Sequence, residues 1–292
     1  MSPAAINPCI VVMANLSAAA EQAARYAAVL GAPQQACLEL LHLYHDPLLD
    51  PELVTVTAAH TFRTQAETAA LLREQARQLG VPAEVKVSVQ PLATAVQEAV
   101  CQGHPQLLVM GLSAERTLLD HLMHNQALPL LRTTHCPLLL VPEGAPPPRL
   151  PRRIALAVDA EQFRLNDAAE ALEPLLASWQ AAYTAVHVLV PGGREAYPGQ
   201  RALNHLRMSG LLPATQPLEL YEEAHVRPAA GMLQAIIDTQ ADMLVLIARP
   251  RSFLGRLFHE SVTAEVLRHS MVPVLLLPAR SPAQPAWMPS MT

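Results

Sequence analysis

Cys136-Pro-Leu-Leu-Leu-Val141 and Val272-Pro-Val-Leu-Leu-Leu277 are two apolar segments with one shared pattern, 136 residues apart. In each, a proline precedes an uninterrupted apolar run of strand length, which is typical of a strand buried on both faces. Strands of this kind lie in parallel sheets that helices cover on both sides. Because the chain has 292 residues, about twice the length of a usual domain, the repeat predicts one α/β domain present twice.

The segments upstream of these two strands repeat in the same order. Asn15 follows an apolar run and corresponds to Asp159, 144 residues later, while Leu41-His-Leu43 corresponds to Val186-His-Val188 at an offset of 145. Leu107 corresponds to Met243 at an offset of 136. A near-constant offset with one deletion of about nine residues is what gene duplication leaves.

Alternating apolar strands and helical patterns predict five strands in each half, with a helix in each connection, including one helix between Asp159 and Tyr183. The expected strands are Cys9–Ala14, Ala36–Tyr44, Ala83–Val89, Leu107–Met110, Pro137–Val141, Arg153–Val158, Tyr183–Leu189, Leu218–Tyr221, Met243–Ile247 and Pro273–Leu277. Right-handed crossovers then give two doubly wound sheets, each with a ligand crevice beyond the carboxyl ends of its strands. The expected boundaries are a first domain over residues 1–143, a proline-rich linker over 144–152, a second domain over 153–279 and a flexible tail over 280–292.

The charge and composition exclude several classes of function. The net charge is −5, Lys86 is the only lysine and no basic run occurs, so we expect no binding to nucleic acid or anionic lipid. No apolar stretch is long enough to cross a membrane, and no signal peptide precedes the first strand, which predicts a cytoplasmic protein. The cysteines Cys9, Cys37, Cys101 and Cys136 include no C-x-x-C pair, so we expect reduced, buried thiols, with a redox or metal site as the alternative.

No motif for catalysis is present. The sequence has no G-x-S-x-G, H-E-x-x-H or Walker loop, and no nucleophile–base pair follows from spacing, so we expect that the protein is not an enzyme. Asp120, His121, His124 and His135 form the richest polar cluster, yet no third ligand has a convincing spacing for a metal site. The two histidines related by the repeat, His42 and His187, lie within apolar strands, which favours hydrogen-bonded residues that support the fold.

Several of these segments resemble the universal stress proteins. The similar parts are the turn Asn15-Leu-Ser17, the strand Leu40-Leu-His-Leu-Tyr44, the strand that ends at Gly111, the run His135-Cys-Pro-Leu-Leu-Leu-Val-Pro142 and the stretch Ser252–Thr263. The resemblance covers nearly the whole chain as two tandem domains. It implies an adenine nucleotide alpha hydrolase-like fold, with five strands per domain in the order 3-2-1-4-5.

Members of that family that bind ATP carry the motif G-x2-G-x9-G followed by Ser or Thr. This spacing falls on Gly111, Ala114, His124 and Asn125 in the first half, and on Ile247, Pro250, Glu260 and Ser261 in the second half. Most of the glycines that would let backbone N–H groups approach a phosphate are therefore missing. Pro250 also lacks an N–H group, and Glu260 would repel phosphate oxygens, so ATP binding in the second half is disfavoured.

The resemblance implies a degenerate adenine-nucleotide crevice. Its residues would be Asn15, Leu43, Gly111 and Asn125 in the first half, and Asp159, Val188 and Ser261 in the second half. We therefore expect a stress-response binding or scaffolding protein without a bound cofactor, metal ion or catalytic residue. An ATP-binding stress sensor with its site in the first half is the alternative, and an electron-transfer flavoprotein-like subunit or nucleotide-dependent enzyme is the third.

The last strand of each domain bears on the expected partners. These strands, Pro137–Val141 and Pro273–Leu277, are apolar and would lie at a sheet edge in the family order. Because an apolar edge can pair with another edge, we expect the two domains to form an internal pseudo-dimer and whole chains to form a homodimer. Other protein partners are an additional expectation.

Overall fold

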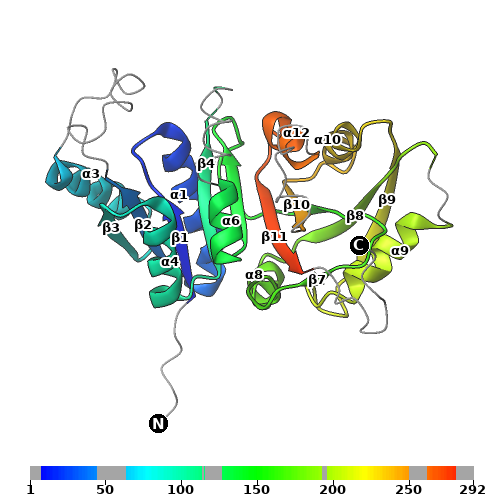
Figure 1. Cartoon of the computed structure of the whole chain (residues 1–292), viewed down its shortest axis with the longest axis horizontal. Helices are drawn as coiled ribbons and strands as arrows, with labels where there is room; N and C mark the ends of the chain where they lie inside the picture. Colours follow the sequence, from blue (N-terminus) through cyan, green and yellow to red (C-terminus); the bar gives the residue numbers. More distant parts are fainter. Residues whose placement is uncertain are drawn as a thin grey trace, which may run out of the picture. The chain divides into compact units, whose positions relative to one another are not determined.

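The computed structural model describes residues 8–44, 64–113, 115, 127–192, 196–249 and 262–280. The chain forms two compact units, and the main boundary between them lies between Pro151 and Arg152. We call residues 8–151 the N-terminal domain and residues 152–280 the C-terminal domain, and each is described by itself (Figure 1).

The N-terminal domain is built on five strands in the order β3-β2-β1-β4-β5 (Figure 1). Each neighbouring pair is parallel. The central strands consist of buried apolar residues, as the sequence pattern predicts. The strands are β1 (Cys9–Met13), β2 (Cys37–Leu43), β3 (Ala83–Ser88), β4 (Leu107–Leu112) and β5 (Leu138–Pro142). The predicted order 3-2-1-4-5 is confirmed.

Helices cover this sheet, and their ends follow local sequence signals. The hydroxyl of Ser17 accepts a hydrogen bond from the N–H of Ala20 at 3.2 Å and so caps α1. Thr64 and Glu67 form a reciprocal capping box at the start of α3. The helices are α1 (Ala18–Gly31), the 3-10 helix η1 (Ala32–Gln34), α3 (Gln65–Gln78), α4 (Leu92–Gly103) and α6 (Leu128–Thr134). The alanine-rich face of α1 packs on β1, β2, β4 and β5, while α4 and α6 pack against each other.

The C-terminal domain repeats the same strand order, as β9-β8-β6-β10-β11. The strands are β6 (Arg153–Ala157), β8 (Ala182–Leu189), β9 (Leu218–Ala224), β10 (Met243–Ala248) and β11 (Val274–Arg280). The pairs β6–β8, β8–β9 and β10–β6 are parallel. Its longer helices are α9 (Pro198–Arg207), α10 (Pro228–Asp238) and α12 (Val262–His269). The duplication read from the sequence is therefore a duplication of topology.

The first connection of the C-terminal domain differs from the prediction of one helix after Asp159. It contains the short strand β7 (Arg164–Leu165), which pairs antiparallel with the end of β11, and then the short helices α7 (Asp167–Glu170) and α8 (Glu173–Ser178). A continuous helix is prevented by Pro174, which lacks an N–H and clashes with the carbonyl four residues earlier. Asn166 instead caps α7, since its side-chain oxygen accepts from the N–H of Ala169 at 2.8 Å.

The histidines related by the repeat make the same bond in both domains. Nδ1 of His42 lies 2.6 Å from the carbonyl oxygen of Ala14, and Nδ1 of His187 lies 2.9 Å from that of Val158. Each bond joins the second strand of a sheet to the residue that follows its first strand. The predicted hydrogen bonds of these two histidines are confirmed.

Candidate functional site

In the N-terminal domain, Asn15, Leu43 and Gly111 lie at or near the carboxyl ends of the adjacent strands β1, β2 and β4. Ala14 donates its N–H to the carbonyl of Leu41 at 2.9 Å, which holds the start of the Asn15 turn beside the end of β2. The side chain of Asn15 is exposed, and its oxygen accepts hydrogen bonds from the N–H and the hydroxyl of Ser17 at 3.1 and 2.6 Å. The fourth predicted residue, Asn125, lies outside the described residues.

Gly111 has a packing role that the sequence motif does not reveal. A Cβ at this position would lie 2.2 Å from the carbonyl oxygen of Ala19 and 2.7 Å from the nitrogen of Ala20. The first turn of α1 thus rests directly on the backbone of β4. Close helix–strand approach explains this glycine without a phosphate ligand.

In the C-terminal domain, Asp159 and Val188 lie at the carboxyl ends of β6 and β8. One carboxylate oxygen of Asp159 accepts from the N–H of Glu161 at 3.1 Å, which makes it a turn residue. Val188 packs on α10, because a Cβ at Gly231 would lie 2.8 Å from its Cγ1. The third predicted residue of this half, Ser261, lies outside the described residues.

Arg249 is the residue of this site that the sequence analysis missed. It follows β10 directly, and its guanidinium forms ion pairs with Asp159 and Glu161. It also donates to the carbonyl of Glu161 at 2.8 Å and lies 5.9 Å from the centroid of the Phe163 ring. Only 16% of the Arg249 side chain is exposed, against 58% for Asp159. A cation of the chain itself therefore binds the carboxylate that the resemblance assigned to a ligand.

The sequence feature that could have identified Arg249 as a site residue is its place in the chain. It stands in the connection after the fourth strand of its domain, where the family places the phosphate loop. A cation there can meet the carboxylate after β6, because β6 and β10 are parallel neighbours.

Burial and Arg249 act in opposite directions on the pKa of Asp159. Partial burial at the strand end raises this pKa above the ordinary value for aspartate, while the nearby guanidinium of Arg249 lowers it. A raised pKa in the folded state means that the stability contributed by this group is present in acid and is lost as the pH rises through that pKa. Arg249 offsets part of that loss at neutral pH.

We expect Arg249→Gln to raise the pKa of Asp159 further and to destabilise the C-terminal domain by about 1 kcal/mol at neutral pH, since the pairs are partly exposed. The difference from wild type should shrink in acid, where the carboxylates are protonated. NMR titration and urea unfolding measure the two effects. Arg280→Gln is the control, because Arg280 pairs with Asp167 at 3.2 Å with both side chains well exposed. An unchanged Asp159 pKa in Arg249→Gln would contradict the assigned pairing.

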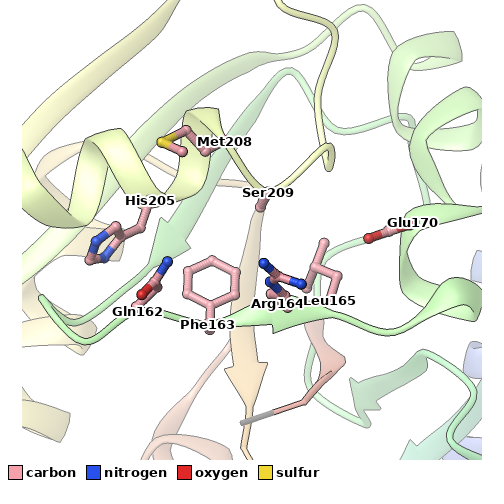
Figure 2. Close-up of a pocket in the computed structure, with 8 residues that line it drawn as sticks. All are labelled: Gln162, Phe163, Arg164, Leu165, Glu170, His205, Met208 and Ser209. Atoms are coloured by element: carbon pink, nitrogen blue, oxygen red, sulfur yellow. The ribbon is translucent and has the colours of Figure 1, made fainter. Parts of the chain in front are cut away.

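A cavity of about 580 Å³ opens beside this cluster, between the segment Gln162–Leu165, α7 and the C-terminal end of α9 (Figure 2). Figure 2 shows Phe163 on one side of it, and His205 of α9 and Met208, the residue after α9, on the other. Its lining residues are Gln162, Phe163, Arg164, Leu165, Glu170, His205, Met208 and Ser209. Nδ1 of His205 is buried and has no hydrogen-bond partner among the described residues. The cavity thus offers an aromatic wall, a cation and an anion to a small polar molecule.

The described residues hold no group of three or more His, Cys, Asp or Glu side chains that could bind a metal ion. His135 is the residue after α6, in a left-handed conformation that ends the helix. The other members of the predicted polar cluster, Asp120, His121 and His124, lie outside the described residues. In the part of the chain that the structure describes, no helix is long and apolar enough to span a membrane.

Two mostly parallel five-stranded domains of the order 3-2-1-4-5 define a tandem α/β protein with the adenine nucleotide alpha hydrolase-like fold. The family model described as "Universal stress protein family" matches the chain twice, at residues 9–142 and 151–278. The chain therefore belongs to the universal stress protein family.

Solved structures agree with this fold. A universal stress protein from Archaeoglobus fulgidus DSM 4304 is similar with a TM-score of 0.61 at 13% identity, over 92% of this chain and 95% of that chain. A putative universal stress protein from Pseudomonas aeruginosa UCBPP-PA14 is similar with a TM-score of 0.55 at 17% identity, over 94% of each chain. No curated protein matches the chain.

Proposed function

We propose that this universal stress protein is a non-catalytic, stress-response binding or scaffolding protein whose C-terminal domain does not bind ATP. The observation that supports this most directly is the position of Arg249, which is held by Asp159 and Glu161 beyond the carboxyl ends of β6 and β10. A nucleotide that used Asp159 would have to displace this guanidinium. Charge-assisted hydrogen bonds are among the stronger ones in proteins, so the displacement opposes binding.

The sequence around Arg249 supports the same proposal. The next residue, Pro250, has no N–H to donate to a phosphate. Glu161, in the segment after β6, adds a second carboxylate beside that of Asp159, and its side chain is 78% exposed. Carboxylates repel phosphate oxygens, and no glycine of the ATP-binding motif is retained in this domain.

Calorimetry of the whole chain with ATP and Mg²⁺ tests the proposal. We expect no binding with a dissociation constant below about 1 mM, which corresponds to about −4 kcal/mol of binding free energy. Binding that is tighter than this and is lost in Asp159→Asn would refute the proposal for the C-terminal domain. Binding that persists in Asp159→Asn would point to the other domain.

The second candidate is an adenine-nucleotide site in the N-terminal domain. It is favoured by the exposed amide of Asn15 just after β1, which pairs with no arginine among the residues that the structure describes, whereas Asp159 does. An amide at this place can still hydrogen-bond a ribose or base. If ATP binds here, Asn15→Leu should abolish the binding and Asp159→Asn should leave it unchanged.

We also propose that the two domains pair as an internal pseudo-dimer and that whole chains form a homodimer. The support is the apolar sequence of the last strand of each domain, β5 and β11. Light scattering of the whole chain after size-exclusion chromatography tests the homodimer, and a strict monomer over a range of concentrations would refute it.

A further inference from the structure

Cys9 and Cys37 begin two neighbouring strands of the N-terminal domain. Cys9 is the first residue of β1, Cys37 is the first residue of β2, and the two are direct partners in the parallel register. Side chains alternate between the faces of a sheet, and the register partners of a parallel pair point to the same face. The two thiols therefore lie side by side on one face.

The two side chains are neighbours in the register and partly open to solvent. Sγ of Cys37 lies 3.6 Å from the carbonyl oxygen of Pro8, the residue before Cys9. Both cysteines are of intermediate exposure, whereas Ile10 and Val11 directly beyond Cys9 are fully buried. A small reagent can thus reach a thiol pair at the rim of the core.

We propose that Cys9 and Cys37 are a reversible dithiol–disulfide couple that a hydroperoxide oxidises. Neighbouring strands are about 4.8 Å apart, and a disulfide needs Cα atoms about 4.4 to 6.8 Å apart, so the bridge requires little backbone movement. This couple is independent of any nucleotide site, because it lies at the amino ends of the strands and the crevice lies at their carboxyl ends.

The two cysteines have different parts in the reaction. Burial, and next the neighbouring Cys37, raise the pKa of Cys9 to about 12, so Cys9 is a poor first nucleophile. The sulfur of Cys37 attacks the peroxide and the O–O bond breaks. The thiol proton of Cys37 passes to the departing oxygen, which leaves as an alcohol or water, and Cys37 becomes a sulfenic acid. The sulfur of Cys9 then attacks the sulfur of Cys37, the S–O bond breaks and water leaves. One hydroperoxide is reduced by two electrons for each disulfide formed.

The other two cysteines are the controls within the chain. Cys101 is exposed, and Cys136 is buried with a pKa that burial raises to about 12. Neither is a register partner of another cysteine in the described strand pairs. They should not pair with Cys9 or Cys37.

The test is peroxide treatment of the folded whole chain, followed by digestion without reductant and peptide mass mapping. We expect a Cys9–Cys37 linked peptide, two hydrogen atoms lighter than the separate peptides, that dithiothreitol reverses. In Cys9→Ser, Cys37 should be trapped as a sulfenic acid that dimedone labels; in Cys37→Ser, Cys9 should stay unmodified. Cys101→Ser and Cys136→Ser should leave the linked peptide unchanged.

A second measurement does not depend on the variants. A dithiol-specific cross-linker such as dibromobimane should join Cys9 to Cys37 in the reduced wild-type protein, and prior peroxide treatment should abolish that labelling. Oxidation of Cys37 to a sulfinic acid without a linked peptide, or peroxide-insensitive labelling, would overturn the proposal.

Discussion

Gly111→Ala is expected to lower the stability of the N-terminal domain by more than about 3 kcal/mol, beyond the range of most single substitutions. The added Cβ would lie 2.2 Å from the carbonyl oxygen of Ala19, which is backbone and cannot turn away as a flexible side chain could. The helix cannot shift cheaply either, because α1 buries nine residues and its first turn is fixed by the Ser17 cap. Close-packed interiors transmit such an overlap as strain.

Gly103→Ala is the matched control for Gly111→Ala. Gly103 is the last residue of α4, and a Cβ there would meet nothing within 4 Å. This control should be within about 0.5 kcal/mol of wild type, as surface substitutions usually are. Hydrogen exchange of the β1 and β4 amides measures the effect in both variants. Equal protection of these strands in Gly111→Ala and wild type would show that α1 does not rest on Gly111.

The fold could be predicted from the sequence because buried parallel strands leave a local signature. Val272–Leu277 and its counterpart Cys136–Val141 can be predicted as buried strands from their own residues, without knowledge of the strands they pair with. The offsets between the two halves then give the positions of the other strands. The prediction of one helix between Asp159 and Tyr183 was wrong, since the structure has β7, α7 and α8 there, and the reason is also local. Asn166 caps the short helix α7 and Pro174 lies in the first turn of α8, so both residues are local signals for two short helices in place of one long one.

The site could be predicted less well, because its contacts join residues far apart in the chain. Arg249 meets Asp159 across 90 residues, and nothing local marks an arginine as the partner of a given carboxylate. Gly111 is predicted as a nucleotide-binding residue, which stays a prediction, and only the position of Ala19 shows that α1 packs against it. The contact of Cys9 with Cys37 depends on the strand register, which a sequence pattern does not fix.

Replacing either His42 or His187 by leucine is expected to destabilise the protein by the second-largest amount, after Gly111→Ala. Each replacement should destabilise only the domain that contains it. His187→Leu removes the hydrogen bond to the Val158 carbonyl, where His187 is only 7% exposed and Val158 is 5% exposed. A buried acceptor that loses its partner costs about 1–3 kcal/mol, so we expect about 2 kcal/mol in the C-terminal domain. His42→Leu should have a similar effect in the N-terminal domain through the Ala14 carbonyl.

The two domains can be told apart by fluorescence and hydrogen exchange. Trp179 is buried in the C-terminal domain, so urea unfolding monitored by its emission should shift in His187→Leu and not in His42→Leu. Hydrogen exchange of the β1 and β2 amides should be faster in His42→Leu and unchanged in His187→Leu. His269→Leu is the control, because His269 also bonds a backbone carbonyl, that of Glu265 at 2.8 Å, but at an exposed position. If all three variants were equally stable, the histidine–carbonyl bond that both domains share would not stabilise the pairing of their first two strands.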